Sequence, residues 1–144
     1  MIQASKITKS YGSLKVLKGI DLEIAPGEIV SIMGDSGAGK TTLLQSLGTL
    51  ENPDGGIVKI KEQDIFLLSQ KKLAKFRNEN IGFVFQFHHL LPEFNALENV
   101  CIPGFIGKRK KEEVEEYAKE LLSLLGLQDR MDHKPSAMSG GEQQ

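Results

Sequence analysis

The sequence predicts an α/β fold, and three observations support that prediction. A glycine-rich loop over residues 34–41 lies between an apolar run and a segment with helical spacing. Short, loosely alternating segments open the chain before that loop and indicate a small β region. After the loop, segments of strand and helix character alternate, which favours a core with a largely parallel sheet.

The β region before the loop is expected to contain several short strands. Residues 2–10 alternate loosely, and Tyr11-Gly12 predicts a turn. Residues 14–17 and 20–24 predict two more short strands. Residues 28–33 are largely apolar, so they predict a buried strand that leads directly into the glycines.

The loop itself fits Gly-x-x-x-x-Gly-Lys-Thr, a pattern that binds phosphate groups. Its glycines let the backbone approach a ligand closely, and a helix predicted over 42–47 turns its positive end toward a polyphosphate. Lys40 supplies a mobile charge for the outer phosphates, and the Thr41 hydroxyl suits Mg²⁺. The predicted phosphate-binding set is Gly34, Asp35, Ser36, Gly37, Ala38, Gly39, Lys40, Thr41 and Thr42.

The elements after the loop follow from periodicity and turn residues. They are a strand over 57–60, a helix from Ser69 to Asn78, a strand over 81–85, a short helix over 96–102 ended by Pro103-Gly104, and a helix over 109–125 stopped by Gly126. The last helix is the clearest, because its apolar residues form one stripe. That stripe consists of Val114, Tyr117, Ala118, Leu121, Leu122 and Leu125, and the glutamates beside it predict a solvated face.

Composition limits the classes of function. A net charge of −1 gives no bulk electrostatic case for nucleic-acid binding. The single cysteine, Cys101, excludes an internal disulfide and is expected to pack as a small apolar residue. The pair His88-His89 has no third ligand at useful spacing, so an exposed loop is favoured over a metal site. No apolar run approaches the roughly 18 residues of a membrane span, so contact with a membrane would need a partner.

Four motifs occur in one order: the upstream aromatic Tyr11, the phosphate loop, the glutamine Gln86 after an apolar segment, and Ser139-Gly140-Gly141 near the end. Together they make the chain resemble the nucleotide-binding domain of ABC transporters. By itself Tyr11 favours a core or hairpin residue, although its ring could also stack on a nucleobase. Met138 and Glu142 replace the leucine and glutamine that flank the serine and glycines in the family signature.

The resemblance implies roles for these residues. Tyr11 would stack on the base of ATP, and Gln86 would contact Mg²⁺ and the attacking water and face a membrane subunit. Ser139, Gly140 and Gly141 would contact ATP held by a second copy of the chain. The implied cofactors are ATP and Mg²⁺. The implied partners are transmembrane permease subunits and a second ATPase subunit, at the cytoplasmic face of the inner membrane, with no nucleic acid.

The implied fold is a P-loop NTPase core with an N-terminal antiparallel β region and a helical subdomain. Residues 1–85 would form the β region and core, and residues 86–144 the Q-loop and helical subdomain, of a partial domain over 1–144. The family's Walker B strand, with its catalytic glutamate, and its switch histidine follow the signature and do not occur in these 144 residues. The intact protein is therefore expected to be an ATPase, and this chain alone is not.

A finer resemblance concerns residues 83–94 and 96–100, which are similar to the ATP-binding subunit of lipoprotein-releasing ABC systems. ATPases of cell division and of macrolide export share part of that pattern. Two alternatives to lipoprotein release therefore stay open. The chain could be a nucleotide-binding module without turnover, or its parent could serve a complex of the cell-division or macrolide-export type.

Overall fold

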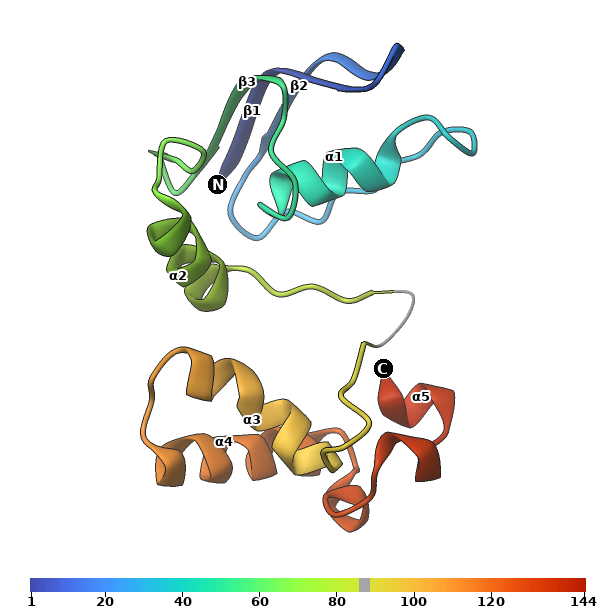
Figure 1. The fold of residues 1–144 in the computed structure, drawn as a ribbon, viewed down its shortest axis with the longest axis vertical. Coiled ribbons are helices and arrows are strands. Elements are labelled where there is room, and N and C mark those ends of the chain that lie inside the picture. The colour runs from blue at the N-terminus through green and yellow to red at the C-terminus, as the bar shows by residue number, and fades with distance from the viewer. Residues whose placement is uncertain (86–88) are drawn as a thin grey trace. The chain divides into compact units, whose positions relative to one another are not determined.

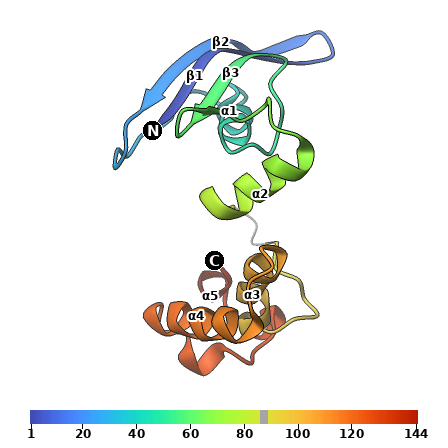
Figure 2. The same cartoon turned by 90° about the vertical axis from the view of Figure 1, so that its left-hand side faces the viewer.

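The computed structural model describes residues 1–85 and 89–144, in two compact units, Met1–Arg77 and Asn78–Gln144 (Figures 1 and 2). The sequence places the boundary after residue 85, whereas the two units divide within a helix, between Arg77 and Asn78. The elements of the first unit are β1 (Ile2–Tyr11), β2 (Leu14–Ile24), α1 (Lys40–Leu47), β3 (Gly55–Ile60), β4 (Gln63–Asp64) and most of α2 (Gln70–Asn80).

The first unit is built on a four-stranded antiparallel sheet in the order β2-β1-β3-β4. Strand β1 lies between β2 and β3, so Ile2 pairs with both Ile24 and Ile60. Helix α1 packs against β1 and β2. The side chains of Ile7, Val58 and Ile65 are fully buried and form the centre of this unit. The predicted antiparallel β region is confirmed.

Strand β2 is continuous, so the prediction of two short strands over 14–17 and 20–24 is wrong. Gly19, with φ +90°, is skipped in the register, because Ile7 pairs with Ile20 and Thr8 pairs with Lys18. A β-bulge at a glycine adds one residue without ending the ladder. The glycine that suggested a break between two strands is therefore the bulge of one strand.

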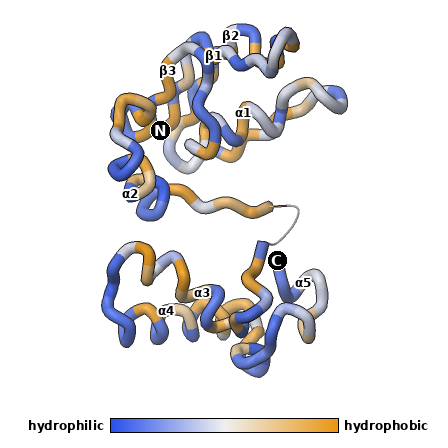
Figure 3. Tube along the Cα trace, viewed as in Figure 1, coloured by the Kyte–Doolittle hydropathy of each residue, from blue (hydrophilic) through white to orange (hydrophobic). Residues whose placement is uncertain are grey.

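The expected parallel strands over 28–33 and 81–85 are not formed, and every ladder within the described residues is antiparallel. Ile29 is 98% exposed and Met33 is 89% exposed, so the first segment is not buried either. The second segment is also mostly apolar (Figure 3). Apolar composition favours burial, but a strand also needs a neighbour to accept its backbone hydrogen bonds. In the described part of the chain neither segment has such a neighbour.

The second unit is helical, as the sequence predicts, and contains α3 (Ala96–Ile106), α4 (Lys111–Leu124), the 3₁₀ turns η1 (Gln128–Arg130) and η2 (Pro135–Ala137), and α5 (Gly140–Gln143). Asn95 caps α3 in a capping box with Glu98, since each side chain accepts from the other residue's backbone N–H. Helices α3 and α4 pack against each other around Cys101, Val114 and Ala118. The thiol of Cys101 is buried, as predicted.

Helix α3 does not end at Pro103-Gly104, so that prediction is wrong. Proline removes one helical donor, but its carbonyl still accepts from the N–H of Gly107 at 3.0 Å and from Nδ2 of Asn78 at 2.9 Å. Gly104 lies so close to Val114 that a Cβ would be 2.7 Å from both γ-carbons. Packing against α4 therefore stabilises the part of α3 that follows Pro103.

Helix α4 confirms the predicted amphipathic helix, although fewer stripe residues are buried than expected. Val114, Ala118 and Leu122 are buried at four-residue spacing, whereas the side chain of Tyr117 is 56% exposed. Gly126 ends the helix as predicted, with φ +73°. Its N–H donates to Ser123 and the next N–H donates to Leu122, which is a Schellman motif.

Candidate functional site

The phosphate-binding loop predicted from the sequence precedes α1 in the first unit. Gly34, Gly37 and Gly39 have φ values of +150°, +79° and +90°, a region that side chains with a Cβ rarely occupy. The N–H of Ala38 donates to Asp35 and closes a turn, and α1 begins at Lys40, two residues before the predicted start. The glycine pattern therefore forms the strained loop and helix start that it predicts.

Gly39 is also required for packing. A Cβ at this position would lie 2.8 Å from Cγ1 of Val16 and 3.2 Å from Cδ2 of Leu17. Both residues belong to β2, so the absence of a side chain lets the end of the loop rest against that strand. Strand β2 thus fixes where α1 begins.

Lys40 closes the loop with its side chain. Its Nζ donates to the carbonyl oxygens of Gly34 at 2.8 Å and Asp35 at 2.7 Å. An ammonium group has three donors, so one remains for a further acceptor. The first backbone N–H groups of α1, including those of Thr41 and Thr42, have no acceptor within the helix. Positive charge and open N–H donors therefore meet at the start of α1, an arrangement that suits an anion.

Tyr11, at the end of β1, is joined to this helix. Its hydroxyl donates to Oε2 of Glu51 at 2.6 Å, and it also interacts with the hydroxyl of Thr42. The hydrogen bond to the Glu51 carboxylate raises the pKa of Tyr11 above its ordinary value. The fold thereby brings together two of the predicted nucleotide-binding residues. Glu51 was not among the residues that the sequence pattern singled out.

The predicted signature residues Ser139, Gly140 and Gly141 lie at the start of α5 in the second unit. The hydroxyl of Ser139 accepts from the N–H of Glu142 at 3.3 Å, and the Glu142 carboxylate accepts from the N–H of Ser139 at 2.7 Å. Nothing lies within 4 Å of a Cβ placed on either glycine, so the backbone there is open. The glutamate that replaces the family's glutamine thus completes a capping box.

Arg130, which the sequence did not single out, reaches this motif from η1. Its Nε lies 2.9 Å from Oε1 of Glu142. The N–H of Ser139, and after it Arg130, lower the pKa of Glu142 to about 2. The negative charge of Glu142, which replaces the family's glutamine, is therefore paired with the positive charge of Arg130 in the same unit.

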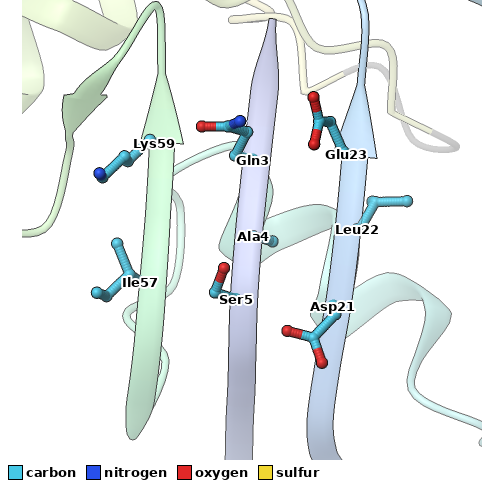
Figure 4. Close-up of a pocket in the computed structure, with 8 residues that line it drawn as sticks. All are labelled: Gln3, Ala4, Ser5, Asp21, Leu22, Glu23, Ile57 and Lys59. Atoms are coloured by element: carbon cyan, nitrogen blue, oxygen red, sulfur yellow. The ribbon is translucent and has the colours of Figure 1, made fainter.

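Gln86 and His88 lie outside the described residues, and among those described no cluster of His, Cys, Asp or Glu could hold a metal ion. The phosphate loop and the signature belong to different units. A hollow of about 490 Å³ lies on the face of the sheet of the first unit, and none of the phosphate-loop residues lines it (Figure 4). Its lining includes Gln3, Ser5, Asp21, Glu23, Ile57 and Lys59, from three neighbouring strands.

Comparison with known families covers the stretch that contains both the loop and the signature. A family model described as ABC transporter matches residues 17–144. The chain belongs to the ABC transporter family. Among curated proteins of this family, the lipoprotein-releasing system ATP-binding proteins LolD of Bacteroides thetaiotaomicron and Porphyromonas gingivalis are 61% and 57% identical to it. Both matches cover 100% of this chain and 66% of the relative, so the chain spans slightly less than two thirds of their length.

Solved structures of ABC cassettes also match. A dimeric ATP-binding cassette in a post-hydrolysis state, bound to ADP and Pi, is 40% identical with a TM-score of 0.89. A second structure of the same cassette, also dimeric and described as that of a bacterial ABC transporter, is 40% identical with a TM-score of 0.90. Each match covers 99% of this chain and 65% of the other. In the described part of this ABC family member, no helix has the length and apolar character to cross a membrane.

Proposed function

We propose that the protein, at the full length of its relatives, is the ATP-binding subunit of an ABC transporter that releases lipoproteins from the inner membrane. The observation that carries the proposal is the phosphate loop, in which Lys40 and the open N–H groups of α1 form an anion site. Identities of 61% and 58% to two lipoprotein-releasing ATP-binding proteins favour this subfamily. Binding and hydrolysis of ATP would drive the transport step.

The loop fits a nucleoside triphosphate with Mg²⁺. The run from Gly34 to Thr42 offers backbone donors and one ammonium group to the phosphates, and Tyr11 offers a partly exposed ring to the base. Thr41 is exposed in the first turn of α1, where its hydroxyl could serve a hard cation. Thr41 and Gln86 would hold Mg²⁺, which neutralises charge on the phosphate oxygens.

These residues would act mainly by positioning, because phosphoryl transfer needs aligned groups and charge stabilisation more than covalent chemistry. Lys40 would stabilise negative charge at the outer phosphates. Ser139, Gly140 and Gly141 of a second copy would present their backbone to the same nucleotide, in a dimer like the cassettes that this chain matches. Transmembrane permease subunits would hold the dimer at the cytoplasmic face of the inner membrane.

Calorimetric titration with MgATP tests the binding site. The wild-type chain is expected to bind saturably, and Lys40→Ala to weaken binding by at least about tenfold, because a charged contact to phosphate is lost. Lys71→Ala, on the exposed side of α2, is the matched control and should bind like wild type. Equal affinity in the wild type and Lys40→Ala would overturn the assigned site.

Turnover and cargo need the full-length protein with its membrane partners. Phosphate release should be abolished by Lys40→Ala, and the wild-type complex should release a lipoprotein from proteoliposomes when ATP is added. Wild-type turnover by Lys40→Ala would contradict the catalytic role. Turnover without lipoprotein release, together with copurification of a cell-division or macrolide-export membrane protein, would favour those systems.

A further inference from the structure

Tyr11 is held by a small charged network at the end of β1. Its hydroxyl donates to one carboxylate oxygen of Glu51, and Nζ of Lys9 lies 3.1 Å from the other. Lys9 also donates to the carbonyl of Asn52 at 2.7 Å and lies 3.5 Å from Asp54. The turn that follows α1 therefore contacts both the ammonium group of Lys9 and the hydroxyl of Tyr11.

The network determines how the tyrosine ring can be used. Nζ of Lys9 lies over the ring, 5.7 Å from its centroid, so one face is next to a cation. The side chain is still 48% exposed. A ring that is fixed at its hydroxyl and covered by Lys9 on one side keeps its other face for a flat ligand. A ring that is already held in one orientation loses less conformational entropy when a base stacks on it.

We propose that Glu51 is the positioning residue for Tyr11, and that it controls nucleotide affinity by fixing the ring on which the base stacks. This inference rests on the proposed function, because it assumes that a nucleotide binds at the phosphate loop. Glu51 does not touch the nucleotide in this account. It acts only through the tyrosine hydroxyl and, through Lys9, on the covered face of the ring.

The electrostatics of the network agree with that role. Hydrogen bonds from Tyr11 and Lys9 lower the pKa of Glu51, so its carboxylate stays ionised at neutral pH. An ionised carboxylate is a stronger acceptor for a phenol hydroxyl than a neutral group is. The hydrogen bond between Tyr11 and Glu51 is therefore charge-assisted.

A mutant cycle measured with MgADP tests the inference, because ADP carries the base but is not turned over. Glu51→Ala is expected to raise the Kd of the full-length protein about five- to tenfold, as one charge-assisted hydrogen bond and the ring's orientation are lost. In a Tyr11→Ala background the same change should alter the Kd less than about twofold. Equal effects in the two backgrounds would mean that Glu51 acts through general stability, and would overturn the inference.

Further variants keep the test decisive. Glu51→Gln retains an acceptor for the tyrosine hydroxyl and should recover most of the affinity. Asp54→Ala removes contacts of the same turn to Lys9 and Ser10 without touching Tyr11, so it should change the Kd less than about twofold. If Glu51→Ala does not fold, Tyr11→Phe carries the same expectation, because it removes only the hydroxyl.

The two proposals fail in different ways. Absence of MgADP binding by the wild type would overturn the proposed function and this inference together. Binding that is lost in Lys40→Ala, but unaffected by Glu51→Ala or Tyr11→Phe, would overturn this inference alone.

Discussion

Nε of Arg130 donates a hydrogen bond to Oε1 of Glu142 over 2.9 Å, which joins the turn η1 to the signature helix α5. The other carboxylate oxygen accepts from the N–H of Ser139 at 2.7 Å. Two donors therefore hold the acidic residue that stands where the family signature has glutamine. Their combined effect lowers the pKa of Glu142 to about 2, with the larger part from Ser139.

Arg130→Gln should raise the pKa of Glu142, because it removes the positive charge beside the carboxylate. The pKa should remain below its ordinary value, because the hydrogen bond from the N–H of Ser139 is the larger cause and is retained. Titration of the Glu142 carboxyl carbon by NMR measures the shift, with exposed Lys134→Gln as the control. An unchanged pKa in Arg130→Gln would show that the pair has no electrostatic effect on the signature.

The signature cap should weaken in acid. Because the pKa of Glu142 is lowered by folding, its ionised form contributes stability above the ordinary value of 4.5, and that contribution is lost as the pH falls toward about 2. The protection of the Ser139 amide against hydrogen exchange should therefore fall over this range. Glu142→Gln, which has no charge to lose, should show little such change. Equal pH dependence in both proteins would contradict the role of the carboxylate.

The sequence correctly predicted those structural features that are determined by residues adjacent in the chain. The strained glycines before α1 and the glycine stop at Gly126 were correct, because a few adjacent residues determine them. The strands over 28–33 and 81–85 were wrong, because pairing depends on a partner that a local pattern does not contain. The bond between Tyr11 and Glu51 joins residues 40 positions apart, so it could be found only from the fold.

Gly39→Ala should disrupt the phosphate loop, because a Cβ would lie 2.8 Å from Val16 in a backbone with φ +90°. We expect a loss of about 2–4 kcal/mol in unfolding free energy, from backbone strain together with overpacking. Nucleotide binding should fall with it. Gly27→Ala is the matched control, since its φ of +78° brings the strain but nothing lies within 4 Å of its Cβ. Urea unfolding measures the loss of unfolding free energy in each variant. The loss in Gly27→Ala reports backbone strain alone, and the additional loss in Gly39→Ala reports overpacking against β2. Equal losses in the two variants would show that contact with β2 does not contribute.

The close approach of α3 and α4 at Gly104 and Val114 gives a prediction of coupling between two substitutions. Alanine in place of glycine within a helix would normally stabilise it by about 1 kcal/mol. Here the new Cβ would lie 2.7 Å from both γ-carbons of Val114, so overpacking of about 1–3 kcal/mol should exceed that gain. Gly104→Ala is therefore expected to lower the unfolding free energy.

Val114→Ala alone should cost roughly 2 kcal/mol, because it removes two buried methyl groups from the contact with Cys101 and Ala118. In the double variant the new methyl group occupies space that the valine has left, so the combined loss should be at least about 1 kcal/mol smaller than the sum of the single losses. Ser123→Ala, on an exposed position of α4, should show no coupling with Gly104→Ala. Additive losses for Gly104→Ala and Val114→Ala would mean that α3 moves away from α4 to accept the extra carbon. Contact between Gly104 and Val114 would then not fix the separation of the two helices.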